Sequence, residues 1–177
     1  MAQTHRTLIG DILQETPDTI TLRLEKPQSF DFLAGQFVTI DTKQFPALQT
    51  TSQGKKHGPR AYSIGSSPTK DYVDITVKKE KKGKLSSWVV DAKELRKGDT
   101  VEIKGPFGNF TYNKGDVVLI AAGSGIVPIR AMLQYIIDKD LNVNATLLYS
   151  NKTRESTIYR QELESIKKPN IQIFHTL

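Results

Sequence analysis

The chain has no cysteine in its 177 residues. This absence excludes disulfides, cysteine nucleophiles and thiolate-ligated zinc or iron–sulfur centres within the sequence. Histidine is scarce as well, and His5, His57 and His175 are too scattered to predict a metal site or a general base. We therefore expect no metal site in this chain. Any metal centre that takes part in its reaction would belong to a partner protein.

Long hydrophobic runs are also missing. The longest uninterrupted apolar stretch covers only residues 117–122, whereas a membrane-spanning helix needs about 20 apolar residues. Residues 1–6 lack the apolar centre of a secretory signal. We expect a cytoplasmic protein with no membrane span.

The charge is only moderately one-sided. The 25 Lys and Arg residues against 19 Asp and Glu residues give a net charge of +6. This surplus suits phosphate-bearing cofactors or an acidic protein partner, although a surplus of this size often serves only solubility. The sequence shows neither an aromatic-basic RNA signature nor a DNA-reading helix, so no nucleic-acid partner is expected.

The first hundred residues alternate polar and apolar side chains in short runs. These runs predict strands at 7–13, 19–25, 35–40, 60–66, 72–79 and 100–104. The first two strands flank a turn around Pro17 and predict a hairpin, whereas the polar segment 42–59 predicts a long exposed loop. The pattern is typical of a β-barrel or sandwich that ends near Tyr112.

One strand in this region carries Arg60, Ala61, Tyr62 and Ser63 in succession. Neighbouring side chains in a strand face opposite ways, so Arg60 and Tyr62 share one face and Ser63 points across. A guanidinium can bind phosphate and an aromatic ring can cover a flat heterocycle. The alternative is a half-buried strand with an arginine at its solvent end.

A basic turn follows the next strand and leads into a short amphipathic segment. Gly83, Lys84, Leu85 and Ser86 open this segment, and Ser86 is a candidate helix cap. A helix N-terminus carries partial positive charge and free N–H groups, so this opening is a candidate phosphate site. The alternative is a solvated lysine turn.

The pattern changes after the polar break at 113–116. The apolar run 117–122 predicts a parallel strand covered on both faces, and 126–138 has helical spacing. Gly123, Ser124 and Gly125 lie between them, which predicts a turn whose backbone N–H groups reach a pyrophosphate; Pro128 replaces the third glycine of the dinucleotide fingerprint.

A second strand at 144–150, a helix at 156–166 and a third strand at 171–174 complete a β-α-β-α-β unit. This unit is one half of a doubly wound parallel sheet. We therefore predict two domains, with a β domain over 1–112 and the first half of an α/β nucleotide-binding domain over 113–177.

Four motifs in this order resemble the ferredoxin–NADP reductase-like superfamily of flavoenzymes. They are Arg60-x-Tyr62-Ser63, Gly83-x-x-Ser86, Gly105-Pro106-Phe107-Gly108 and Gly123-x-Gly125-Ile126-x-Pro128. The resemblance covers nearly the whole chain. It implies an antiparallel six-stranded β-barrel that binds FAD, followed by an α/β parallel-sheet domain that binds NAD(P)H.

The resemblance also implies roles for individual residues. Arg60 matches the arginine on the flavin pyrophosphate, Tyr62 the aromatic packed on the isoalloxazine, and Ser63 the residue that hydrogen-bonds flavin N5. Tyr62 and Ser63 are thereby the candidate catalytic residues. The remaining matches are Val77 and Lys78 along the ribityl and phosphates, Gly83, Lys84, Leu85 and Ser86 at a second pyrophosphate clamp, and Gly123, Ser124, Gly125 and Pro128 at the NAD(P)H turn.

The end of the second parallel strand indicates which nicotinamide nucleotide is used. Ser150, Lys152 and Arg154 place a hydroxyl and two cations before the first acid, which favours the 2′-phosphate of NADPH over NADH. NADH stays open, because the two cations are also consistent with solvated loop charges.

The predicted function is transfer of hydride from NAD(P)H to FAD and of electrons onward to an acidic ferredoxin-like or haem protein. The alternative is an FAD-carrying electron-transfer subunit or regulatory module without its own NAD(P)H turnover. Members of the family continue to a C-terminal motif with a cysteine, which this sequence lacks. We expect a fragment rather than a reduced member, since half a parallel sheet leaves an apolar edge open.

Overall fold

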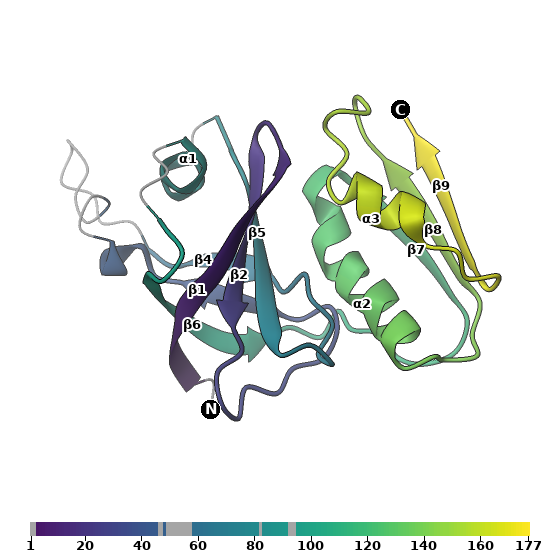
Figure 1. Cartoon of the computed structure of the whole chain (residues 1–177), viewed down its shortest axis with the longest axis horizontal. Helices are drawn as coiled ribbons and strands as arrows, with labels where there is room; N and C mark the ends of the chain where they lie inside the picture. The colour runs from purple at the N-terminus through teal and green to yellow at the C-terminus, as the bar shows by residue number, and fades with distance from the viewer. Residues whose placement is uncertain (1–2, 46–47, 49–57, 82, 92–94) are drawn as a thin grey trace.

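A computed structural model describes residues 3–45, 48, 58–81, 83–91 and 95–177, except for the side chain of Lys84 (Figure 1). The first part of the chain forms one six-stranded antiparallel sheet, in the order β4-β3-β6-β1-β2-β5. Its strands are β1 (Gln3–Thr16), β2 (Thr19–Glu25), β3 (Phe37–Ile40), β4 (Arg60–Ser63), β5 (Tyr72–Lys78) and β6 (Thr100–Phe107). The predicted hairpin is confirmed, because Thr16 pairs with Thr19 across the turn.

The sheet curls but does not close. Its two terminal strands, β4 and β5, are joined by a single bridge between Ile64 and Ile75 and by no ladder. Because this bridge is antiparallel, the residues of β4 before Ile64 and the residues of β5 after Ile75 lie on the same side of it. The predicted six-stranded antiparallel fold is confirmed, with an opening between β4 and β5.

The segment 42–59 differs from the exposed loop expected from its polarity. Residues 42–44 form a short 3₁₀ turn, η1 (Thr42–Gln44), and Thr42, Phe45 and Leu48 are buried. The Phe45 ring packs 4.8 Å from that of Trp88, which lies in α1 (Lys84–Asp91). Prediction of an exposed loop was therefore wrong at these three positions, because Phe45 and Leu48 pack into the core of the antiparallel sheet. Residues 46–47 and 49–57 lie outside the described part of the chain.

The second part of the chain is a parallel sheet in the order β7-β8-β9. The elements of this part of the chain are β7 (Val117–Ala122), η3 (Gly123–Gly125), α2 (Ile126–Asp138), β8 (Ala145–Ser150), α3 (Arg160–Ser165) and β9 (Ile171–Thr176). The helix expected over 156–166 forms only from Arg160. Ser156 instead bonds to Thr153 in a turn, and Tyr159 adopts a left-handed conformation with φ of 58° that a continuous helix cannot contain.

Only one face of this parallel sheet is covered by described residues. The strands follow one another in the order 7-8-9, and right-handed crossovers in one direction place both helices on the same face. Figure 1 shows α2 and α3 on the side of the sheet that faces the antiparallel unit. Val118, Ile120, Leu148 and Phe174 are exposed on the other side, so the prediction of a β7 strand covered on both faces was wrong.

Two hydrophobic cores result, one inside the curled sheet and one between the parallel sheet and its helices. No described helix is long and apolar enough to cross a membrane. Among the described residues, no three His, Cys, Asp or Glu side chains group as metal ligands would.

Candidate functional site

The opening between β4 and β5 is a cleft of about 440 Å³. All of β4 borders it on one side and alternate residues of β5 border it on the other, while α1 and the start of α2 complete the wall. The lining residues are Thr42, Leu48, Arg60, Ala61, Tyr62, Ser63, Thr76, Lys78, Glu80, Gly83, Leu85, Ser86, Ser124 and Val127. The incomplete closure of the sheet therefore creates the site.

The cleft brings together eight residues that the sequence had singled out at separate places: Arg60, Tyr62, Ser63, Lys78, Gly83, Leu85, Ser86 and Ser124. Val77 does not border it, because its neighbours on β5 face the cleft and its own side chain, 1% exposed, packs in the core. Gly123, Gly125, Pro128, Ser150, Lys152 and Arg154 are also absent from the lining. The assigned roles of all these residues remain predictions.

The β4 side of the cleft carries polar groups without partners in the described part of the chain. The hydroxyls of Tyr62 and Ser63 make no hydrogen bond with any described residue, although both side chains are half-buried. Among the described residues, Arg60 donates only to the carbonyls of Gly58 and Pro59, each at 3.3 Å. A cation, a phenol and a hydroxyl on one short strand suit a ligand with phosphate at one end and a heterocycle at the other.

The turn before α1 is too tight for any residue other than glycine at 83. A Cβ at Gly83 would lie 2.3 Å from Ser86 Oγ and 2.8 Å from Glu80 Cβ. Ser86 lies inside the helix and not at its cap: its hydroxyl accepts from the Glu80 N–H and donates to the Gly83 carbonyl. The expected cap was wrong in position, but the serine still fixes the turn that borders the cleft.

The glycine turn before α2 leaves its backbone open. Gly123 has φ of +49°, and a Cβ at Gly123 or Gly125 would meet nothing within 4 Å. The buried Tyr149 donates its hydroxyl proton to the Gly123 carbonyl at 3.0 Å and so holds the turn in place. Pro128 lies in the first turn of α2, where a missing N–H costs no intrahelical bond. Ser124 and Gly125 are exposed, so this turn is a candidate site for a pyrophosphate.

Of the predicted 2′-phosphate residues, Ser150 lies at the sheet edge beside this turn. Ala122 and Ser150 are register partners on adjacent parallel strands, so Ser150 follows the same sheet edge as the glycine turn. Lys152 and Arg154 are exposed in the next loop. The Arg154 guanidinium is 3.6 Å from Glu164 and borders a second cleft, between the β1–β2 hairpin and α3, so a nucleotide phosphate would have to draw it from that acid.

Sequence reasoning missed several residues of the cleft wall. Thr76 was recognisable, since it lies two residues before Lys78 and therefore on the same strand face. Thr42 and Leu48 lie in a segment that looked like an exposed loop, and no local pattern signals their burial. Glu80 is an acid in a wall otherwise suited to phosphate.

Glu80→Gln should tighten binding of a phosphate-bearing cofactor. Removing one exposed negative charge near a phosphate is worth about 0.5–1 kcal/mol, or roughly a two- to fivefold lower Kd. Titration of the apo-protein by fluorescence quenching measures the change, with Glu102→Gln as a charge-matched control on the exposed face of β6. Equal Kd values for the two variants would show that Glu80 does not approach the phosphates.

Burial raises the pKa of the Tyr62 phenol to about 12, and the nearby Arg60 only partly opposes this. The phenol is thus neutral at ordinary pH. Because the pKa in the folded state exceeds the unfolded value of about 10, its contribution to stability is complete below about pH 10 and is lost as pH rises through about 12.

Tyr62→Phe should therefore weaken the alkaline loss of stability. The loss attributable to this phenol is at most about 2–3 kcal/mol in the free energy of unfolding. Urea unfolding at a series of pH values tests this, and the variant should match the parent at neutral pH because the hydroxyl has no hydrogen bond to a described residue. Parallel pH curves for the two proteins would contradict the assignment.

Known families match both parts of the chain. The oxidoreductase FAD-binding domain matches residues 10–112, and the oxidoreductase NAD-binding domain matches residues 119–177. The chain therefore belongs to the family of FAD- and NAD-binding oxidoreductases, as the four motifs indicated.

Individual relatives are longer than this chain. The glycine betaine monooxygenase reductase subunit of Chromohalobacter salexigens is 30% identical over 168 residues, which cover 92% of this chain and 43% of the relative. The flavohemoprotein of Bacillus subtilis is 34% identical over 141 residues, or 78% of this chain and 33% of the relative. The chain thus spans less than half the length of these curated relatives.

Solved structures share the fold. The ferredoxin-NADP+ reductase of Plasmodium falciparum, solved with 2'P-AMP, has a TM-score of 0.80 at 22% identity and matches 99% of this chain and 74% of its own. Phthalate dioxygenase reductase has a TM-score of 0.76 at 24% identity and matches 97% of this chain and 51% of its own. The predicted two-domain ferredoxin reductase-like fold is confirmed, with an antiparallel sheet that does not close.

Proposed function

We propose that this chain is the cofactor-binding part of a flavin-dependent reductase that takes hydride from NADPH and passes electrons to a protein acceptor. The observation that carries the proposal is the shared cleft: the Arg60–Ser63 strand and Ser124 of the glycine turn border the same space. A site for FAD and a site for a nicotinamide nucleotide therefore open toward each other. Membership of the FAD- and NAD-binding oxidoreductases supports this assignment.

The residues of the cleft divide the work of holding FAD. Arg60 and the backbone of the Gly83 turn would bind its phosphates, and Tyr62 would cover the ring. The Ser63 hydroxyl would hydrogen-bond flavin N5 and orient the reacting edge. Bound FAD supplies the redox chemistry, as acceptor of hydride and donor of electrons, so the chain needs no acidic or nucleophilic side chain.

Anaerobic reduction is the direct test. The purified protein should be yellow, release its chromophore in acid, and lose its flavin absorbance when NADPH is added without oxygen. A protein that holds FAD but stays yellow would be an electron-transfer subunit without nicotinamide turnover, and a colourless protein that does not take up FAD would overturn the flavin assignment.

NADPH should be preferred over NADH through Lys152 and Arg154. Replacing both with alanine should lower the NADPH-to-NADH ratio of kcat/KM about tenfold or more, since each cation can pair with the 2′-phosphate. The double variant Arg6→Ala with Lys167→Ala removes the same charge from exposed positions away from the turn. An unchanged ratio in the first variant, or an equal change in both, would show that these cations do not read the 2′-phosphate.

We propose an acidic iron–sulfur or haem protein as the electron acceptor. The net charge of +6 favours such a partner electrostatically. Relatives include a monooxygenase reductase subunit, a monooxygenase ferredoxin reductase component and flavohemoproteins. Reduction of an acidic ferredoxin should slow steeply with added salt, while reduction of the flavin at saturating NADPH should not. We propose that the protein is located in the cytoplasm, because reduced nicotinamide nucleotides are supplied there. Fractionation of host cells tests this proposal.

A further inference from the structure

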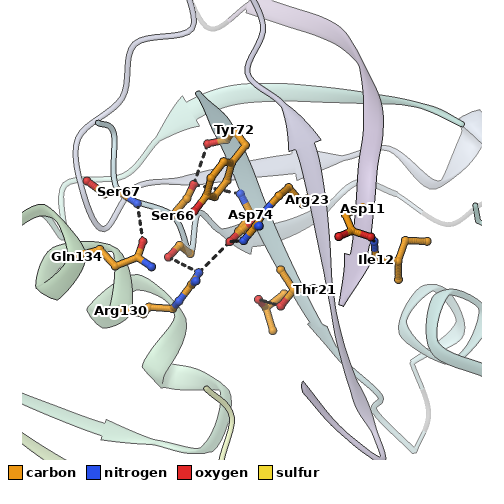
Figure 2. Close-up of polar contacts among 12 residues, drawn as sticks. Asp11, Ile12, Thr21, Arg23, Ser66, Ser67, Tyr72, Asp74, Arg130 and Gln134 are labelled. Atoms are coloured by element: carbon orange, nitrogen blue, oxygen red, sulfur yellow. Dashed lines mark hydrogen bonds and ion pairs between the residues drawn. The ribbon is translucent and has the colours of Figure 1, made fainter. Parts of the chain in front are cut away.

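A buried ion cluster joins the two parts of the chain next to the cleft (Figure 2). Asp74 of β5 has 0% exposure and accepts from two arginines: Arg23 at 2.9 and 3.1 Å, and Arg130 of α2 at 3.0 Å. Asp74 lies on the polar face of the alternating strand β5. The face is buried because α2 packs over it, and two guanidinium partners make a buried carboxylate tolerable there.

Arg130 bridges three separate segments. Besides Asp74, it donates to the Gly65 carbonyl at 3.0 Å and to both carboxylate oxygens of Glu162 in α3 at 2.9 and 2.8 Å. Its guanidinium also lies 4.4 Å from the centre of the Tyr159 ring. Burial alone would lower the pKa of Arg130, but Glu162, Tyr159 and Asp74 outweigh burial and raise it, so the cation stays charged.

The same face of α2 continues this contact along the helix. Gln134, one turn after Arg130, accepts from the Ser67 N–H at 3.0 Å and donates to Glu162 at 2.9 Å. Asp138, one turn further, accepts from Thr69 and Lys70. Residues spaced by four lie on one helix face, so three successive turns of α2 bind the 65–70 connection between β4 and β5.

This row of contacts ends at the cleft. Val127, one turn before Arg130, lines the cleft, and the glycine turn with Ser124 comes immediately before it. On the other side of the interface, Asp74 lies two residues from Thr76 and four from Lys78, which border the same cleft. The ion cluster thus connects β5, which borders the cleft proposed to hold FAD, directly to α2, the helix proposed to begin at NADPH.

We propose that Arg130 is a positioning residue that fixes the start of α2 against β5 and so sets the approach of nicotinamide to flavin. The proposal has a geometric part, the fixed position of α2 against β5, and a kinetic part, the effect of this position on hydride transfer. Only the kinetic part rests on the proposed function. Hydride transfer requires reacting atoms about 3–3.5 Å apart, and a displacement of about 1 Å can cost about 100-fold in rate. A rigid clamp one turn from the cleft wall is suited to that requirement.

Gly65 shows how closely the interface is packed. A Cβ at Gly65 would lie 3.0 Å from the Tyr159 hydroxyl, 3.2 Å from Val127 Cγ1 and 3.6 Å from Arg130 Nη1. Gly65→Ala therefore pushes the two surfaces apart by a few tenths of an ångström without removing a charge. Gly10→Ala is the matched control, since its Cβ would meet its nearest neighbour, the Arg23 carbonyl, at an ordinary 3.6 Å.

The geometric part is tested without cofactor. The chain has no cysteine, so spin labels on Lys104→Cys and Lys167→Cys, both exposed and on opposite sides of the interface, report one distance. Arg130→Met should broaden the distance distribution, Arg130→Lys should broaden it less, and Gly65→Ala should shift it slightly. An unbroadened distribution in folded Arg130→Met would overturn the proposal, whatever the flavin does.

The kinetic part is tested by stopped-flow reduction of bound FAD. Arg130→Met should slow reduction at saturating NADPH about tenfold or more, while the Kd values for FAD and NADPH change less than about threefold. Gly65→Ala should slow it less, and Gly10→Ala should not. A broadened distance distribution with an unchanged reduction rate would overturn the positioning role of Arg130. If NADPH does not reduce the parent protein, the proposed function is overturned, and the spin-label distances alone then test whether Arg130 fixes α2 against β5.

Discussion

Ser63→Ala should retain FAD but slow its reduction by NADPH about 100-fold. Loss of one preorganised donor at a reacting atom typically costs about 10²–10³ in rate. The hydroxyl lies in the cleft, has no hydrogen bond to a described residue and is free to serve a ligand. Stopped-flow absorbance gives the reduction rate, and titration of the apo-protein gives the Kd for FAD, which should stay within about twofold.

Ser63→Thr is the matched control, because it keeps the hydroxyl and threonine suits a strand. It should recover most of the reduction rate. If Ser63→Ala loses only FAD affinity and keeps its rate, or if Ser63→Thr is as slow as Ser63→Ala, the hydroxyl does not act at the reacting nitrogen and Ser63 is a packing residue.

Arg60→Ala should show the opposite pattern. A charge-assisted contact to phosphate is worth about 1.5–3 kcal/mol, so the Kd for FAD should rise roughly 10- to 100-fold. In protein saturated with FAD, the rate of reduction by NADPH should fall less than about threefold, since the guanidinium lies at the phosphate end of the proposed ligand. The two variants together separate binding from chemistry on a single four-residue strand.

Arg6→Ala controls for the change in net charge. Arg6 is exposed on β1 and does not border the cleft. Its removal should leave the Kd for FAD unchanged, whereas Arg60→Lys should restore part of the affinity as a point charge. Equal losses in Arg6→Ala and Arg60→Ala would mean that overall charge, and no specific phosphate contact, accounts for the effect.

Most secondary structure followed from local patterns. Apolar side chains at every second position predicted the strands on both sides of Pro17 and the strand 72–79. Apolar side chains with a period of 3.6 residues predicted α2 over its whole length. Prediction failed where a neighbour from elsewhere in the chain decides burial. The polarity of 42–59 gave no sign that Thr42, Phe45 and Leu48 are buried. The alternation of β5 gave no sign that Asp74 is buried.

The candidate site was found from the sequence only as separate pieces. Arg60, Gly83 and Ser124 lie in recognisable motifs, because tight turns and phosphate binding restrict residue type locally. Their meeting in one cleft was not visible, since it depends on the gap between β4 and β5, which a single bridge joins. Glu80 and Val127 were missed because neither residue type is distinctive for cofactor binding.

By itself, the sequence determined the family and the order of the motifs, since backbone restrictions and side-chain periodicity act over a few residues. Only the tertiary structure decided three further features. The sheet remains open beyond Ile64 and Ile75, which makes the cleft. Asp74 becomes the shared partner of Arg23 and Arg130. Both helices cover one face of the parallel sheet. Each depends on contacts between residues distant in the chain, which no local pattern encodes.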